Sequence, residues 1–180
     1  FMLLRLRSIW RIVREVDLET IRKTAQAPAR VTIVGDEAHE AERLAELLGG
    51  PDWAANPAID VAGPTLSPGR IERSSAGTAT EGEVEGTDVV VLVAKEPGLT
   101  PSLAATRREL AAAGTPIVTM ITGTDKPQTE KPANGERVRI GVPSIDERAS
   151  VAVMTALLGA VEPDVRLALA RRLPRLRPLL

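Results

Sequence analysis

Short apolar runs rich in β-branched residues recur along the chain and predict the strands of a buried sheet. Residues 30–34 (RVTIV) form a β-branched run that ends at a glycine. Residues 88–94 (DVVVLVA) and 115–121 (TPIVTMI) are apolar almost throughout, with no alternation of polar and apolar positions. Such continuous runs are typical of parallel strands that are covered on both faces.

Weaker patterns complete the expected sheet. Short strands are predicted at residues 58–62, near residues 70–72 and at residues 137–141. Residues 122–136 are rich in threonine, lysine, proline and glycine, and they predict a polar loop without regular structure.

Helices are predicted between and around these strands from apolar residues at three- and four-residue steps. The expected helices cover residues 2–23, the stretch from Asp36 to Gly49, Pro101 to Gly114, residues 145–158, and Pro163 to Arg172 or Leu173. Asp36 and Thr100 are expected to cap the second and third of these helices, and Ser144 with Glu147 forms a capping-box pattern before the fourth.

The alternation of strands and helices predicts the fold class: an α/β protein with a three-layer, mostly parallel sheet and added amphipathic helices at both ends. We expect an N-terminal helix and linker at residues 1–29, an α/β domain at 30–160, and a basic helix and tail at 161–180. A ligand of such a sheet binds beyond the carboxyl ends of its strands.

Composition excludes several classes of site. The 180 residues include no cysteine, so disulfides, thiolate zinc sites and cysteine nucleophiles are ruled out. His39 is the single histidine, and no serine or carboxylate lies at a triad-like spacing from it, so we expect a surface residue. Aromatic residues make up 2%, which disfavours a base-stacking surface for nucleic acids. No run of 18 apolar residues predicts a membrane-spanning helix.

Charge is distributed unevenly along the chain. Residues 1–30 carry seven basic and three acidic groups, whereas residues 31–100 carry four basic and thirteen acidic groups. Residues 161–180 are again basic, with five arginines against two carboxylates. An acidic middle section repels phosphates and other anions.

The order of segments resembles the Era-like branch of the small GTPases. Residues 87–125 are similar to that family's passage of buried strand, helix, second buried strand and guanine-reading loop, and residues 137–158 to its closing strand, serine loop and last helix. Residues 164–180 are similar to the segment that follows the GTPase domain in bacterial proteins with a membrane-associated helical C-terminal half. The resemblance implies a fold of the P-loop GTPase type.

The phosphate motif of that family is altered here. A P-loop reads G-x-x-x-x-G-K-[ST], with backbone amides around a phosphate, a lysine on the terminal phosphates and a hydroxyl on magnesium. The aligned stretch keeps Gly35 but has Glu40, Ala41 and Glu42 in place of the second glycine, the lysine and the hydroxyl. Four carboxylates, at 36, 37, 40 and 42, therefore stand where the resemblance would put a triphosphate.

The remaining nucleotide motifs are partial. Asp60 and Gly63 match the D-x-x-G pattern, and Asp125 is the one residue retained from Asn-Lys-x-Asp. By resemblance, Gly35, Asp60, Gly63 and Asp125 are vestigial nucleotide-binding residues. Each also has an ordinary structural interpretation, such as a loop aspartate in a turn. A phospho-acceptor aspartate after residues 88–94 and a G-x-G-x-x-G motif are both missing, which disfavours a receiver domain and a dinucleotide site.

These observations lead us to expect a pseudo-GTPase: a catalytically inactive, GTPase-like binding or scaffolding module in the bacterial cytoplasm, acting through a protein partner or at the inner face of the membrane. We expect no catalytic residue, cofactor, metal, nucleic acid or small-molecule substrate. The alternatives are a GTPase that still binds nucleotide through a degenerate P-loop, and a structural subunit of a larger assembly. The expected contact residues are Arg5, Arg7, Trp10, Arg11, Arg14, Arg171, Arg172 and Arg175.

Overall fold

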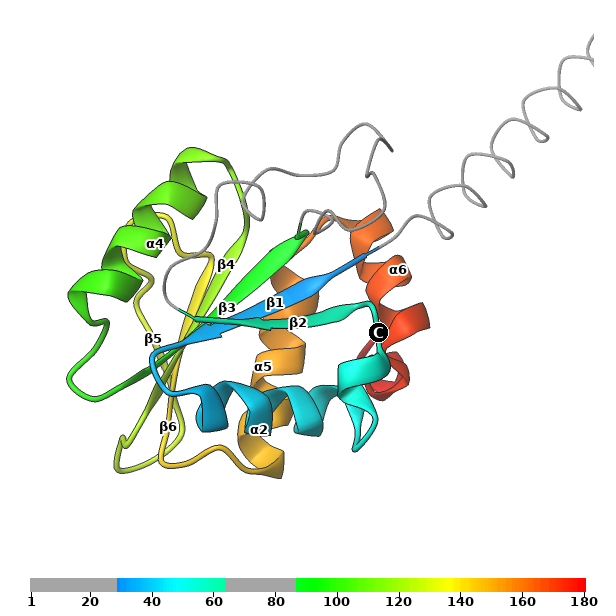
Figure 1. Cartoon of the computed structure of the whole chain (residues 1–180), viewed down its shortest axis with the longest axis horizontal. Helices are drawn as coiled ribbons and strands as arrows, with labels where there is room; N and C mark the ends of the chain where they lie inside the picture. The colour runs from blue at the N-terminus through cyan, green and yellow to red at the C-terminus, as the bar shows by residue number, and fades with distance from the viewer. Residues whose placement is uncertain (1–28, 64–86) are drawn as a thin grey trace, which may run out of the picture.

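The computed structural model describes residues 29–63 and 87–180. They form one six-stranded sheet in the order β2-β1-β3-β4-β6-β5, flanked by helices (Figure 1). The strands are β1 (Val31–Gly35), β2 (Ile59–Ala62), β3 (Val89–Lys95), β4 (Ile117–Thr122), β5 (Gln128–Glu130) and β6 (Val138–Val142). All neighbouring pairs are parallel except β5 with β6, so the predicted α/β class with a mostly parallel sheet is confirmed.

Helices cover both faces of this sheet. They are α2 (Ala38–Gly49), α4 (Pro101–Ala112), α5 (Glu147–Ala160) and α6 (Pro163–Arg172), with short 3₁₀ segments η1 (Trp53–Ala55) and η2 (Pro174–Leu179). In β3, Val89, Val91 and Val93 belong to the core shared with α2, α5 and α6. Val90 and Leu92 face the core beneath α4, on the opposite side (Figure 1). The continuous apolar run of β3 is therefore explained by burial on both faces.

The strand β5 departs from the expected loop at residues 122–136. Its residues Gln128, Thr129 and Glu130 are polar and mostly exposed, so they show no apolar periodicity. They are strand only because they pair antiparallel with Arg139, Ile140 and Gly141 of β6, a contact that local sequence does not encode.

Two helix caps also differ from the expected ones. Thr100 caps α4 as predicted, because its hydroxyl accepts from the Leu103 amide at 3.3 Å. The helix α5 instead begins after Asp146, whose carboxylate accepts from the Ala149 amide at 2.9 Å, so the predicted capping box at Ser144 is wrong. The N-cap of α2 is Glu37 rather than Asp36, and no side chain caps this helix.

The C-terminal segment packs into the core of the α/β domain. Leu169, Leu173 and Leu176 are fully buried in the cluster that also contains Ile33 of β1 and Leu44 of α2. Leu167, which lies three and six residues before Ala170 and Leu173 and so suits the same apolar stripe, is instead 53% exposed. The buried stripe follows the packing surface rather than the pattern of α6 alone.

Three arginines of this C-terminal segment donate hydrogen bonds to carbonyls near the ends of three helices. Arg175 reaches Leu47 O in α2 at 2.6 Å, Arg166 reaches Leu158 O in α5 at 2.8 Å, and Arg177 reaches Ala170 O in α6 at 3.2 Å. Cations at helix C-termini satisfy free carbonyls and complement the helix dipole. These arginines therefore stabilise the domain.

Two predicted elements, the helix at residues 2–23 and the strand near residues 70–72, lie outside the described residues. Within the part of the chain that the structure does describe, no helix has both the length and the apolar character needed to cross a membrane.

Candidate functional site

A crevice of about 550 Å³ lies beyond the carboxyl ends of β3, β4 and β6. In the sheet, β2 lies on one side of β1 and β3 lies on the other side. The order of strands therefore reverses between β1 and β3, and α/β sheets bind their ligands at such a switch point. The first turns of α2 form one wall of the crevice. Its lining residues are His39, Glu40, Arg43, Lys95, Glu96, Thr122, Gly123, Pro143, Ser144 and Ile145.

The connection between β1 and α2 is very short. The strand ends at Gly35 and the helix begins at Ala38, so only Asp36 and Glu37 separate them. No residue from Gly35 to Glu42 has a positive φ. A loop that wraps a phosphate with successive amides needs more residues and such left-handed positions. This turn therefore lacks the backbone of a phosphate-binding loop.

Lys95, the last residue of β3, binds the acidic turn. Its ammonium lies 2.6 Å from Glu37 Oε1 and 3.9 Å from Glu40 Oε1. The hydrogen bond from Lys95 lowers the pKa of the Glu37 carboxyl, and the same bond raises the pKa of the Lys95 ammonium. Both side chains are substantially exposed, at 39% and 54%, so solvent screens the pair and its stabilising effect is small.

Glu37, His39 and Glu40 together could ligate a cation. One ligand atom from each lies within 4.8 Å of the others, the one such group in the two described stretches. The imidazole Nε2 of His39 is 3.3 Å from Glu37 Oε2, and its side chain is 78% exposed, as expected of a surface histidine. The Lys95 ammonium already pairs with both carboxylates, at 2.6 and 3.9 Å, so the arrangement is explained as an ion-pair cluster.

None of the four vestigial nucleotide-binding residues lines the crevice. Gly35 is buried at the end of β1 beside Val93 and Ala41, and Gly63 follows β2 and is exposed. Asp60 lies inside β2 opposite Thr32, one position into the strand, and Asp125 is exposed beyond β4. The structure therefore does not gather these four residues around one ligand position.

The crevice residues that sequence motifs missed are chiefly Lys95, Glu96 and Ile145. Lys95 and Glu96 directly follow the predicted strand at residues 88–94, where a ligand of such a sheet is expected, but no motif singled out the lysine. The signal in the sequence that could have identified Lys95 is its position directly after the buried strand at residues 88–94, with the acidic residues Asp36 and Glu37 directly after the strand at residues 30–34.

The expected contact arginines that the structure describes lie at the other end of the sheet. Arg171 is exposed on α6, Arg172 is half-buried, and Arg175 is bound to α2 as described above. Arg5, Arg7, Trp10, Arg11 and Arg14 lie outside the described residues.

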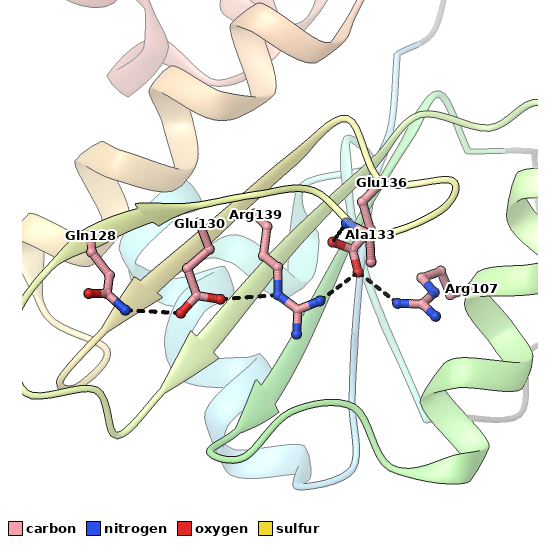
Figure 2. Close-up of polar contacts among 6 residues, drawn as sticks. All are labelled: Arg107, Gln128, Glu130, Ala133, Glu136 and Arg139. Carbon is pink, nitrogen blue, oxygen red and sulfur yellow. Dashed lines mark hydrogen bonds and ion pairs between the residues drawn. The ribbon is translucent and has the colours of Figure 1, made fainter.

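A second polar cluster joins α4 to the β5–β6 hairpin (Figure 2). Glu136, whose side chain is fully buried, accepts from Arg107 of α4 at 3.0 Å and from Arg139 of β6 at 3.4 Å. Arg139 also bonds Glu130 of β5 at 3.2 Å. Positive and negative groups balance, and each carboxylate has an arginine partner. The cluster therefore fastens the hairpin to α4 and leaves no net charge for a ligand.

Fold and site together define an α/β protein with a charged crevice at the switch point of a mostly parallel sheet. No protein-family model matches the chain, and no curated protein and no solved structure is significantly similar to it.

Proposed function

We propose that the chain is a catalytically inactive, GTPase-like module that binds or scaffolds a protein partner. The observation that carries the proposal is the two-residue connection between β1 and α2, which holds Glu37 and Glu40 against Lys95. In a P-loop GTPase a longer glycine-rich loop at this position surrounds the phosphates.

The position aligned with the P-loop lysine supports the proposal independently. Ala41 is fully buried in the core between α2 and the sheet. A side chain at this position points into the protein, and a lysine there would have to bury its charge at considerable cost. The stretch aligned with the P-loop therefore differs from a P-loop in two ways. The helix α2 begins at a different point, and the residues that would contact phosphate and magnesium are replaced.

Phosphoryl transfer depends almost entirely on positioning and on cations around the transferred group. Here Glu40 and Glu42 stand where the motif has a glycine and a magnesium-binding hydroxyl, and Lys95 is already paired with carboxylates. A protein-binding role needs none of these groups. The proposed partner is another protein in the cytoplasm or at the inner face of the membrane.

Calorimetric titration of the full chain with GTP, GDP and ATP, each with Mg²⁺, tests this proposal. We expect no binding heat and no GTP turnover, with an active P-loop GTPase as the positive control. Micromolar binding of GDP, or a turnover that disappears in the Asp60→Asn variant, would show that the chain is a nucleotide-binding GTPase with a degenerate P-loop.

A further inference from the structure

The two ends of the sheet carry opposite charge. At the carboxyl end, the β1–α2 turn, the start of α2 and the loop after β3 carry five carboxylates. Two of them, Glu40 and Glu96, line the crevice together with the cations Arg43 and Lys95. The five carboxylates, here called the acidic end, are Asp36, Glu37, Glu40, Glu42 and Glu96. The acidic end therefore has a formal excess of negative charge.

The amino ends of the strands lie beside α6 and η2, where the charge is reversed. Five arginines face two carboxylates, Glu162 and Asp164, in this region. The arginines, here called the basic end, are Arg166, Arg171, Arg172, Arg175 and Arg177. Bonds to α5 and α2 hold Arg166 and Arg175 at this end of the molecule.

The basic end also carries exposed apolar side chains. Leu167, Leu179 and Leu180 are 53%, 37% and 56% exposed, and the two last leucines border a shallow groove of about 360 Å³ with Leu158 and Arg166. Val151 on α5 is the only other large apolar side chain exposed in the described parts of the chain. Exposed apolar groups gathered in one region and surrounded by charge are typical of interaction surfaces.

We propose that the basic end of one copy docks into the acidic end of a second copy, so that the protein self-associates head to tail. Charge complementarity selects this occupant, because the basic end carries five arginines and the acidic end five carboxylates. The exposed leucines of the basic end match the crevice beside these carboxylates, whose lining includes Pro143 and Ile145. A symmetric contact would bring like charges together at either end, which costs free energy. Head-to-tail contacts form rings or open chains.

This inference goes beyond the proposed function and does not depend on it, since self-association requires no statement about nucleotides. Sedimentation velocity of the full chain, over a range of protein concentrations, provides the test. At low salt the average mass should rise with concentration above the 19.2 kDa of one chain. At about 1 M salt, where the screening length is about 3 Å, it should return to the monomer.

Two sets of charge reversals make the test specific. Asp36→Lys, Glu42→Lys and Glu96→Lys together reverse the acidic end without touching Glu37 or Glu40. Arg171→Glu, Arg172→Glu and Arg177→Glu together reverse the basic end. Each variant alone should be monomeric because both of its ends then carry the same sign. An equimolar mixture of the two should associate again, since the two kinds of chain present complementary ends.

Folding and specificity have separate controls. Circular dichroism checks that both charge-reversal variants are folded. Because Arg177 also bonds α6, its replacement could disturb the fold, so Leu167→Ser provides a second change at the basic end. This change should weaken association several-fold. The paired change Arg108→Glu with Glu109→Lys, on the exposed side of α4, should leave association unchanged.

Three results would overturn the proposal. The first is a monomer at every concentration in low salt, and the second is association that neither set of reversals alters. The third is a monomer whose binding to vesicles of phosphatidylserine and phosphatidylcholine is lost on reversing the basic end, since that surface then contacts lipid.

Discussion

At the scale of single residues, Lys95 determines the charge and the hydrogen bonding of the acidic turn at the candidate site. It ends a strand whose other residues are apolar, and it lies against two carboxylates of the neighbouring β1–α2 turn. The sequence placed four carboxylates near a helix N-terminus and predicted that Asp36 would cap that helix. In the structure, the Glu37 carboxylate accepts a hydrogen bond from Lys95. This bond ties the acidic β1–α2 turn to the end of the neighbouring strand β3.

The titration of Glu37 should report this contact. Its pKa lies below the ordinary value mainly because of the Lys95 hydrogen bond, so Lys95→Met should raise it toward that value. Side-chain carbon NMR over a pH series measures the change. Lys126→Met, at an exposed lysine in the loop after β4, is the matched control and should leave the Glu37 pKa unaltered.

The sign of the pH effect follows from the two shifts. The lowered pKa of Glu37 means that its contribution is complete above its unfolded-state pKa and is lost as pH falls through the folded value. The raised pKa of Lys95 means that its contribution is lost as pH rises through the folded value. Between these limits the pair should add no pH dependence, and a Glu37 pKa that Lys95→Met leaves unmoved would contradict the assigned contact.

At the scale of elements, helix boundaries were predicted well where a cap is encoded locally. Thr100 followed by Pro101 fixed the start of α4, because the hydroxyl and the proline ring act within one turn. Ser144 and Asp146 both suit a cap before α5, and the capping-box pattern with Glu147 favoured Ser144. The structure places Asp146 at the N-cap of α5, with its carboxylate accepting from the Ala149 amide.

Alanine substitution distinguishes the two candidate caps. Asp146→Ala should lower the free energy of unfolding by about 1 kcal/mol, since the Ala149 amide loses its carboxylate partner. Ser144→Ala, two residues earlier and exposed, should change it by less than about 0.5 kcal/mol. Urea unfolding followed by circular dichroism measures both, and the reverse ranking would restore the capping box predicted from the sequence.

At the scale of the whole molecule, the last helix is part of the domain rather than an appended basic arm. Leu169, Leu173 and Leu176 complete the core, and Arg175 ties η2 to the end of α2, more than a hundred residues earlier in the chain. The sequence shows that the segment is rich in arginine, but it does not distinguish arginines that face a membrane from arginines that bond helix carbonyls. Only the packing distinguishes the two roles for Arg166, Arg175 and Arg177.

Removing Arg175 should therefore destabilise the fold. We expect Arg175→Met, which keeps much of the apolar stem, to lower the free energy of unfolding by about 1 kcal/mol, because the Leu47 carbonyl loses a charged donor near the end of α2. Arg108→Met on the exposed side of α4 is the control and should have little effect. Equal stability of the two variants in urea would mean that Arg175 contributes nothing to the fold.

The sequence by itself determined the elements that local patterns encode. Continuous apolar runs specified the buried strands β3 and β4, and glycine, proline and threonine marked the limits of α4, since burial and backbone freedom act over a few residues. Tertiary structure alone decided the pairing of polar β5, the salt bridges of Glu136, the contact of Lys95 with Glu37 and the cap from Arg175 to α2. These depend on which strand ends and helix ends meet in space. The pairs Arg107–Glu136, Lys95–Glu37 and Arg175–Leu47 are 29, 58 and 128 positions apart in the chain and carry no local signal of that meeting.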